Sequence, residues 1–555
     1  MHTTISLVRK TILQAIHSAQ VNGQLPQQNI HDSAVERPHD IERGDYASSL
    51  PLKLSRDFAM DPITIGTAIL DNLTKDYISY TAKIVRPGFI NIHISKEWLL
   101  DQINLVRENP LSYFHQDLGE GKKAQVEYIS ANPTGRLHVA HARGAVIGST
   151  LANILRATGY DVQEEYYLND QGNQIAKFNE SLLVRYKQLF GTDIALPEGG
   201  YPGEDVIEAA KALCERHGNQ FEQMTSEEAL KAIDRVGIKI MVEKIMEDIE
   251  SLKISFDSWF SEASLFKTGR FQECMDILDR KDLTEKIDGA TWLLSKNLGE
   301  EKNNVLIRST GSPTYFATDI AYHYDKFTDK NFDLVIDVWG ADHQGQVARL
   351  KSALAALGTN PDHLRIIIVQ MVRFRNGAIS ERLSKRTGNI IPLQDLVSEI
   401  GADACRFLFL SKAHDSQLEF DLDLAKSQSS DNPIYYLQYA HARICSLLRL
   451  ASEKNINFDN ADVSILRDPL ELIMLRKMIT LPEIIEVASK NLEPHHIPHY
   501  STELATTFHL FYHGCRVISE DDLTTTQARL KLVDSMRISL KFCLDLMGMG
   551  APETM

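Results

Sequence analysis

The sequence lacks any apolar stretch long enough to cross a lipid bilayer. No window approaches the roughly 18 uncharged apolar residues that a membrane-spanning helix needs. Apolar residues make up 43% of the chain and charged residues 24%, which is the balance of an ordinary globular protein. We therefore expect no membrane-spanning helix and no membrane partner.

Paired cysteines are also missing. The six cysteines are scattered along the chain, with no C-x-x-C pair: Cys214, Cys274, Cys405, Cys445, Cys515 and Cys543. Such scatter is typical of buried thiols in a reducing compartment rather than of a disulfide framework or a zinc site. We expect a cytoplasmic location and no protein-bound structural metal.

Basic residues are fewer than acidic residues. The chain carries 59 lysines and arginines against 75 aspartates and glutamates, a formal net charge of −16. No global positive field exists that could hold nucleic acid indiscriminately, so DNA is not an expected partner. A specific RNA, met through local basic patches and shape, remains compatible with this charge.

Three blocks fill the 555 residues, which are too many for a single core. Residues 1–118 predict an α+β domain, with a helix at Pro62–Leu73 and a β-like stretch at Ala82–Ile94. The opening segment predicts an amphipathic helix. Four branched aliphatic residues share its apolar face: Ile5, Val8, Ile12 and Ile16.

The middle block, residues 119–424, alternates strands with helices and predicts a Rossmann-like parallel sheet. Several of its apolar runs are nearly continuous, as in strands buried on both faces. The predicted strands are Gln125–Ser130, Tyr160–Leu168, Asp333–Trp339 and Leu364–Val372. A helix is predicted at Ala142–Thr158, and the charged helical stretch at about 175–253 is read as an insertion.

The last block, residues 425–555, has the 3.6-residue apolar period throughout. One helical segment runs from Tyr435 to Ala451, and others begin near Pro469, His499 and Thr525. A helical bundle is the expected architecture.

The string SANPTGRLHVAHARGAV lies between the first predicted strand and the first long helix of the middle block. Loops at this position meet a helix N-terminus, where free N–H groups and the helix dipole favour phosphate. His138 and His141 are one helical turn apart and can face the same phosphate chain. A metal pair and ordinary helix-capping side chains remain as alternative interpretations of the two histidines.

A second string, SERLSKRTGN at residues 380–389, follows the last buried strand. Arg382, Lys385 and Arg386 surround a small Ser–Lys step. A mobile basic loop of this kind can close over phosphates as they become pyrophosphate. Basic loops are usually just solvated, so the specificity comes from the pairing with the H-x-x-H string upstream.

Together the two strings resemble the HIGH and KMSKS signatures of class I aminoacyl-tRNA synthetases. In detail the chain resembles the arginyl-tRNA synthetases from about residue 44 to residue 555. The similar strings are GDYASSLPLKLS, RPGFINIHI, EYYLNDQGNQ, YFATDIAYH, WGADHQGQ, NPIYYLQYAHARI and GMGAPETM. The resemblance implies a ligase that activates arginine with ATP and transfers it to the terminal ribose of tRNA(Arg).

The resemblance also implies roles for individual residues. The phosphates of ATP would meet His138 and His141 and, in the closing loop, Ser384 and Lys385. The adenosine site would include Gly340, Asp342 and His343. The arginine site would include Glu127, Asn132, Tyr315, Asp319 and Gln346. Tyr315 and Asp319 are four residues apart, so a helix would place them on one face.

Partners follow from the same resemblance. Mg²⁺ would arrive with ATP and bind mainly its phosphates. The N-terminal block would bind tRNA at its elbow, and the helical bundle would bind the anticodon, with the chain acting as a monomer. Residues suited to stacking and phosphate contacts are Tyr435, Tyr436, Tyr439, His441 and Arg443. The alternative for the tyrosines is a place in the bundle core.

Two departures from the family pattern stand out. Ala140 occupies a position where the family usually has glycine, and Arg136 occupies one where bacterial relatives commonly have proline. A methyl group at Ala140 would crowd adenine, so Ala140→Gly is expected to leave or lower the apparent constant for ATP. Two other functions remain as alternatives: a nucleotidyltransferase of the same fold, and a regulatory tRNA-binding relative. All of His138, His141 and Lys385 are present, which favours an active enzyme.

Overall fold

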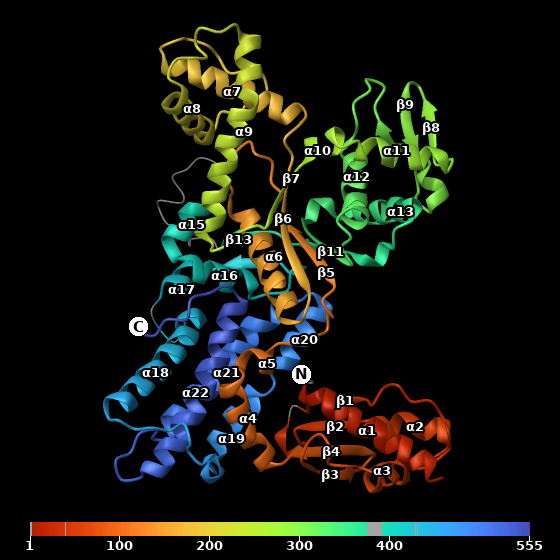
Figure 1. Ribbon diagram of the computed structural model, residues 1–555, viewed down its shortest axis with the longest axis vertical. Coiled ribbons are helices and arrows are strands. Elements are labelled where there is room, and N and C mark those ends of the chain that lie inside the picture. Colours follow the sequence, from red (N-terminus) through yellow and green to blue (C-terminus); the bar gives the residue numbers. More distant parts are fainter. Residues whose placement is uncertain (1–2, 39, 375–390, 428, 430) are drawn as a thin grey trace.

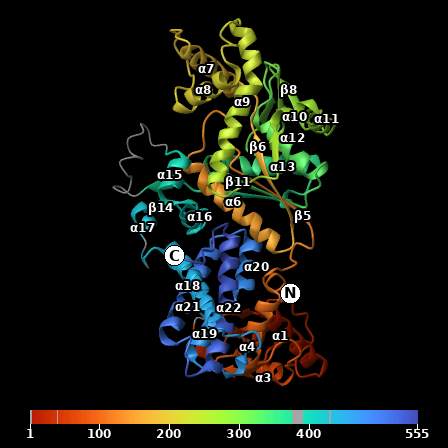
Figure 2. The same ribbon diagram turned by 60° about the vertical axis from the view of Figure 1, so that its left-hand side comes forward.

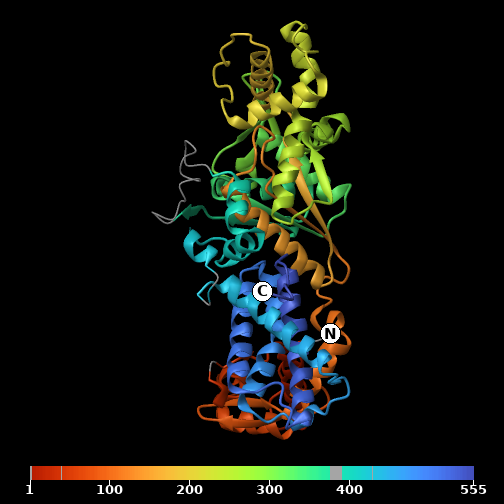
Figure 3. The ribbon, with the colours of Figure 1, turned by 90° about the vertical axis from the view of Figure 1, so that its left-hand side faces the viewer.

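The computed structural model describes residues 3–38, 40–374, 391–427, 429 and 431–555. The molecule is elongated, with the parallel sheet at mid-height and a helical insertion at one end (Figure 1). The N-terminal part and the C-terminal helices lie side by side at the other end in Figure 1, and Figure 3, turned by 90°, shows both at this same end. No helix of the described ranges is long and apolar enough to span a bilayer.

The N-terminal part is an antiparallel sheet covered by helices. Its sheet order is β1-β2-β4-β3. The elements are α1 (Thr4–Val21), β1 (Val35–Glu36), β2 (Tyr46–Ser48), α2 (Leu50–Phe58), α3 (Pro62–Asp71), β3 (Tyr80–Val85) and β4 (Phe89–Ile94). The predicted apolar face of the first helix is confirmed, because Val8, Ile12 and Ile16 are buried. The Asp61 side chain accepts hydrogen bonds at the start of α3, where Pro62 needs no N–H partner. The helix α2 was not predicted.

Five parallel strands form the central sheet, in the order β12-β11-β5-β6-β7. Their bounds are β5 (Lys123–Tyr128), β6 (Asp161–Leu168), β7 (Ser258–Ser261), β11 (Leu334–Gly340) and β12 (Leu364–Val369). The helix α6 (Val139–Ala157) packs on β5, β6 and β11. Side chains from α12 (Tyr315–Thr328) reach β5, β6 and β11 from the other face.

Two predicted strands end earlier than expected. The strand predicted to reach Ser130 stops at Tyr128, because Ile129 and Ser130 take positive φ angles of 69° and 42°. The strand predicted to reach Val372 stops at Val369. Val372 belongs instead to β13 (Val372–Phe374), which pairs with β14 (Leu418–Phe420) outside the central sheet.

Three helices lie in the segment predicted as a helical insertion. They are α7 (Asn173–Leu189), α8 (Glu204–His217) and α9 (Ser226–Ser251). A second inserted region, with its own apolar core, was not predicted. It contains α10 (Glu262–Lys267), α11 (Arg270–Arg280), a sheet of order β10-β9-β8 and α13 (Val347–Leu357). The three short strands are β8 (Thr284–Ile287), β9 (Ala290–Leu293) and β10 (Asn304–Ile307).

The C-terminal block is helical, as predicted. Short helices lead into it, namely α15 (Leu393–Ile400), α16 (Ala402–Leu410) and α17 (Leu422–Lys426). Its long helices are α18 (Pro433–Glu453), α19 (Pro469–Met478), α20 (Leu481–Asn491), α21 (His496–Gly514) and α22 (Leu523–Leu546). The helix α20 was not recognised as separate. Two connecting helices, α4 (Lys96–Glu108) and α5 (Pro110–Phe114), pack against this block.

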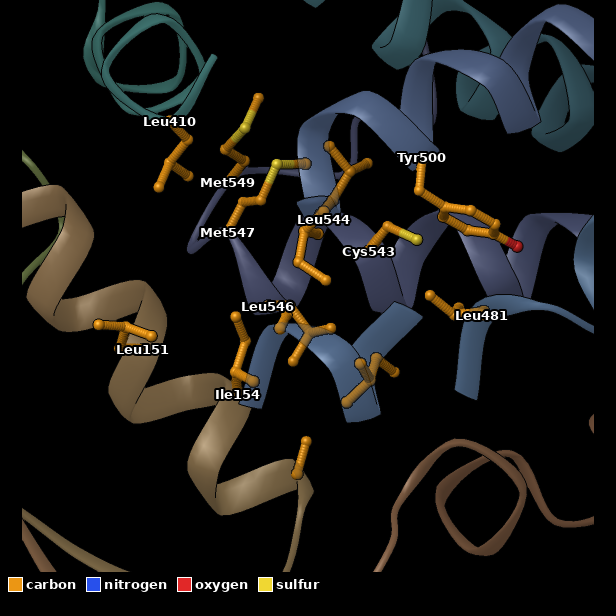
Figure 4. Close-up of a cluster of buried hydrophobic side chains, with 14 of the residues drawn as sticks. Leu151, Ile154, Leu410, Leu481, Tyr500, Cys543, Leu544, Leu546, Met547 and Met549 are labelled. Atoms are coloured by element: carbon orange, nitrogen blue, oxygen red, sulfur yellow. The ribbon is translucent and has the colours of Figure 1, made fainter. Parts of the chain in front are cut away.

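A continuous apolar layer joins the sheet domain to the bundle. In Figure 2 α6 lies between the central sheet and the C-terminal helices, and its contacts with α20 and α22 agree. Figure 4 shows Leu151 and Ile154 of α6 facing Leu546 and Met547 at the end of α22. All four side chains are buried, so this contact belongs to the main core.

Candidate active site

A pocket of about 370 Å³ opens at the carboxyl ends of β5 and β11. The chain leaves β5 toward β6 on one side and leaves β11 toward β12 on the other. The sheet order therefore reverses between these two strands, which is where open α/β sheets bind ligands. We call this cavity the switch-point pocket.

The switch-point pocket collects most of the side chains predicted from the resemblance. All five predicted arginine-site residues line it: Glu127, Asn132, Tyr315, Asp319 and Gln346. Gly340 and His343 line it too, at the end of β11 and in the turn that follows. The side chain of Asp342 is 80% exposed and does not line the pocket. Tyr315 and Asp319 share α12 as predicted.

Glu127 is buried at the floor of the pocket. Its Oε2 atom accepts a hydrogen bond from the Nζ of Lys326 at 2.6 Å, and its Oε1 atom accepts one from the Oγ of Ser130 at 2.9 Å. The positive φ of Ser130 turns the chain so that the hydroxyl meets this carboxylate. Glu127 is thus held in one orientation before any ligand arrives.

Asp319 differs from Glu127 because its carboxylate has no hydrogen-bond donor among the described residues. Burial raises the pKa of Asp319 to about 7, and the nearby charges of Glu127 and Glu262 add to the rise. The charges of His323 and Arg349 counteract the rise. A cation entering the pocket would therefore find a carboxylate with unused acceptor capacity.

A charge cluster that was not predicted lies beneath the pocket. Lys326 Nζ donates to Asp337 Oδ1 at 2.9 Å as well as to Glu127, and His323 Nε2 lies 2.6 Å from Asp337 Oδ2. Glu127, His323 and Asp337 have ligand atoms spaced as in a metal site, but the Lys326 ammonium already forms ion pairs with both carboxylates. The sequence could have indicated this cluster, because positions 319, 323 and 326 follow the helical period and so lie on one face of a helix.

The predicted H-x-x-H pair lies at the start of α6. His138 is the N-cap residue, its backbone N–H donates to Nδ1 of His141 at 3.3 Å, and the ring centroids are 3.8 Å apart. Burial lowers the pKa of His138, and burial with the charge of His138 lowers the pKa of His141 to about 3. His141 is therefore neutral at pH 7, and its proton lies on Nε2, which has no acceptor among the described residues. Ala140 is exposed in the same turn and has no positive φ.

Arg136 ties the loop before these histidines to the helical insertion. Its guanidinium donates to Asp248 of α9 at 2.8 Å, and its backbone N–H donates to Asp205 of α8 at 3.1 Å. Asp248 also accepts the backbone N–H of Leu137 at 2.9 Å. The side chains of Arg136 and Asp248 are 16% and 1% exposed, so this is a buried ion pair.

The second predicted string, residues 380–389 with Ser384 and Lys385, lies outside the described residues. The chain that follows it is described and meets the first string. Val139 N–H donates to the carbonyl of Ile391 at 3.0 Å, and Leu393 N–H donates to the carbonyl of Leu137 at 2.9 Å. The fold thus joins the chain just after the basic string to the residues flanking His138.

An aromatic groove of about 380 Å³ lies between α18 and α21. Tyr435 and Tyr439 line it, with their rings stacked at a centroid distance of 5.8 Å. Arg443 lies beside it and donates to the Tyr439 hydroxyl at 2.7 Å. His441 is a correction to the sequence-based prediction: it is only 2% exposed, and its Nδ1 faces the carbonyl of Pro552 at 2.9 Å, so it cannot stack on a base.

Comparison with protein-family models gives three matches. Residues 6–94 match the arginyl tRNA synthetase N terminal domain, and residues 104–425 match the catalytic domain of class I (R) tRNA synthetases. Residues 437–555 match the DALR anticodon binding domain. The catalytic model alone covers more than half of the chain.

Whole-chain relatives agree with these matches. The chain is 46% identical over 550 residues to the arginine–tRNA ligase of Dehalococcoides mccartyi, covering 99% of each chain. It is 42% identical to that of Caldanaerobacter subterraneus subsp. tengcongensis, over 99% of this chain and 98% of that one. The fold is also similar to Thermus thermophilus arginyl-tRNA synthetase, with a TM-score of 0.77, 21% identity and coverage of 99% and 100%. The chain therefore belongs to the arginyl-tRNA synthetase family of class I aminoacyl-tRNA synthetases.

Proposed function

We propose that the protein is an arginine–tRNA ligase. It activates arginine with ATP to arginyl-adenylate and then transfers the arginyl group to the 3′-terminal ribose of tRNA(Arg), releasing AMP and pyrophosphate. Family membership supports the reaction class. The observation that carries the choice of amino acid is the unpaired carboxylate of Asp319 next to Glu127 in the switch-point pocket.

A guanidinium fits this pair of carboxylates. It is planar, always charged and has five donors, so it binds best where carboxylates accept in a fork. Glu127 is oriented by Lys326 and Ser130, and Asp319 is free to accept. Tyr315 and Gln346 line the pocket beside them. Asn132, whose amide donates to Gln174 at 2.6 Å, is the proposed partner of the α-groups of arginine.

ATP would lie between the first string and the end of β11. The neutral imidazoles of His138 and His141 at the start of α6 would donate to the phosphates, where the helix dipole also favours anions. Gly340, Asp342 and His343 would border the adenosine. We assign Ser384 and Lys385 to binding of the triphosphate. The hydrogen bonds of Leu137 and Val139 with the chain just after residues 380–389 support this assignment. Mg²⁺ would come with ATP and bind its phosphates.

The proposed chemistry needs no protein nucleophile. The carboxylate oxygen of arginine attacks the α-phosphorus, and the P–O bond to pyrophosphate breaks. The 2′-hydroxyl of the terminal adenosine then attacks the arginyl carbonyl, and the bond to AMP breaks. Positioning of the two reactants and hydrogen bonds to the developing charge supply the catalysis.

We assign tRNA binding to the two ends of the chain. The proposed boundaries are residues 1–118 for contact with the tRNA elbow, 119–424 for catalysis and 425–555 for the anticodon. Tyr435, Tyr439 and Arg443 border an accessible groove and would stack on unpaired bases, worth about 1–3 kcal/mol for each base. We infer a monomer that works in the cytoplasm.

Pyrophosphate exchange into ATP, measured with each of the twenty amino acids and with or without total tRNA, tests the proposal. We expect exchange with arginine alone, and only when tRNA is present. In Asp319→Asn, exchange with arginine should fall, while binding of ATP stays unchanged. Exchange that does not depend on which amino acid is present would favour the nucleotidyltransferase alternative. Formation of an adenylated product from another small substrate would favour it too.

A further inference from the structure

Three potential metal ligands meet at the turn between α20 and α21. Glu493, His495 and His496 each offer one ligand atom, and these atoms all lie within 4.8 Å of one another. All three side chains are half-buried. The cluster is remote in sequence from the two strings assigned to ATP, and none of its members lines the switch-point pocket.

One ring nitrogen of the cluster is unpartnered, and another lies against the carboxylate of the cluster. Nδ1 of His495 is buried and has no hydrogen-bond partner among the described residues. Nε2 of His496 lies 2.9 Å from Oε2 of Glu493, and the two imidazole rings stack with centroids 4.4 Å apart. A buried, unpartnered ring nitrogen is costly unless something binds it, and it points to a missing ligand.

Two further histidines flank the cluster, and both are fixed by backbone carbonyls. Nε2 of His499 lies 2.8 Å from the Ser411 carbonyl, and Nδ1 of His414 lies 3.0 Å from the Ile368 carbonyl. The ring of His499 meets that of His495 edge-on at 5.8 Å. The flanking groups that act most strongly on His495 electrostatically are Glu493 and three histidines, His496, His499 and His414.

Charge separates the cluster from the second set of potential metal ligands among the described residues. Glu127, His323 and Asp337 surround the Lys326 ammonium, which already supplies their positive charge. Among the described residues, Glu493 pairs with His496 and forms no ion pair with a lysine or arginine.

We propose that Glu493, His495 and His496 bind one divalent transition-metal ion of the Zn²⁺ class. Two imidazoles and one carboxylate are ligands that Zn²⁺ accepts, whereas Mg²⁺ and Ca²⁺ require oxygen ligands. Water completes the coordination. The α21 helix dipole opposes a cation at its N-terminus, and the charge of Glu493 offsets this effect.

The ion would fasten the end of α20 to the start of α21. His499, one turn into α21, contacts Ser411 just after α16, so the turn lies where the bundle meets the sheet domain. A bound ion would therefore stabilise this junction in the native state and raise its thermal stability by mass action.

Isothermal titration calorimetry tests the proposal on the full-length, untagged chain, stripped with EDTA and titrated with ZnCl₂ without ATP or tRNA. We expect saturable binding of about one Zn²⁺ for each chain. The double variant His495→Ala/His496→Ala should weaken binding about 10-fold or more, whereas the exposed control His363→Ala should not. Excess Mg²⁺ should not compete.

Two further measurements keep the outcome decisive. The metal-free double variant should keep the Tm of the metal-free wild type, which shows that it folds. Co²⁺ should give the strong visible absorption of a four-coordinate ion in the wild type and lose it in the double variant. Unsaturable binding of Zn²⁺, equal affinity in the folded double variant, or displacement by Mg²⁺ would each overturn the proposal.

Discussion

Asp319 is the residue whose protonation should control arginine binding. Its pKa is raised to about 7 by burial and by Glu127 and Glu262, and a guanidinium binds only the ionised form. Below pH 7 the carboxyl proton of Asp319 must leave when arginine binds, whereas above pH 7 it is already absent. The dissociation constant of arginine should therefore rise about tenfold for each pH unit below 7.

Calorimetric titration with arginine between about pH 5.5 and pH 8 checks this slope. In Asp319→Asn, we expect binding to weaken about 10- to 150-fold at pH 8, as for loss of a charged hydrogen bond worth about 1.5–3 kcal/mol. The slope below pH 7 should vanish in that variant. An unchanged slope would assign the titration to another group.

Arg136 is a positioning residue of the loop that carries His138. Arg136→Met removes the guanidinium that neutralises Asp248, whose other partner is the Leu137 N–H. An unpaired buried carboxylate is costly, so the loop should shift. We expect the KM for ATP to rise about 5- to 30-fold, equivalent to about 1–2 kcal/mol, while the KM for arginine changes little.

A double-mutant cycle with Asp248→Asn measures the coupling between the two side chains. The double variant should be less impaired than the sum of the single variants, because each removes the same interaction. Arg136→Lys should recover part of the ATP affinity. Strict additivity would show that the ion pair does not position the loop.

At the scale of elements, α6 carries both histidines and rests on the sheet through glycine. A Cβ atom at Gly148 would lie 2.3 Å from the ring of Tyr128 on β5. Gly148→Ala should therefore push the helix away from the strand and destabilise the protein by about 1–3 kcal/mol. The shift would also displace His138 and His141, so pyrophosphate exchange should fall.

Gly144, one turn earlier in the same helix, is the matched control. A Cβ atom there would lie 3.7 Å from Val338, which is ordinary van der Waals contact. Gly144→Ala should be neutral or stabilising by up to about 1 kcal/mol, since alanine favours helix. Thermal unfolding and exchange activity of both variants check the pair, and equal effects of the two substitutions would contradict the argument.

At the scale of the whole molecule, Arg406 joins the sheet domain to the C-terminal tail. Its guanidinium is buried and donates to the carbonyls of Met547 at 2.5 Å and Leu252 at 3.0 Å, and to the Ser149 hydroxyl at 2.8 Å. Arg406→Met leaves these acceptors unpaired, at about 1–3 kcal/mol for each lost partner. Amide hydrogen exchange near residues 547–553 should become faster.

Arg449 gives the comparison, because it reaches the same tail from an exposed position and bonds the Glu553 carbonyl at 3.3 Å. Arg449→Met should leave hydrogen exchange of the tail nearly unchanged. The tail also sits against α6 in Figure 4, so loosening by Arg406→Met should extend to Leu151 and Ile154. A chain truncated near residue 425 would expose this apolar layer. A loss of activity in it would therefore not by itself assign tRNA binding to the helical block.

Sequence patterns were informative where the physical signal is local. The apolar period of the first helix, the turn before α6, and the spacing of Tyr315 and Asp319 each depend on neighbours within a few residues. The short strands β8 to β10 were missed, because each has only four residues and their partners are defined by pairing. The helix α20 was missed because α19 ends only two residues before it.

By itself the sequence determined the family, the order of the three blocks and seven of the residues that line the switch-point pocket, because motif strings and periodicity are properties of consecutive residues. Only the tertiary structure decided which carboxylate is free. Glu127 is paired with Lys326, 199 residues away, whereas Asp319 has no such partner in the part of the chain that the structure describes. The reason is electrostatic: charge pairing and burial depend on distances in space, which residue order does not contain.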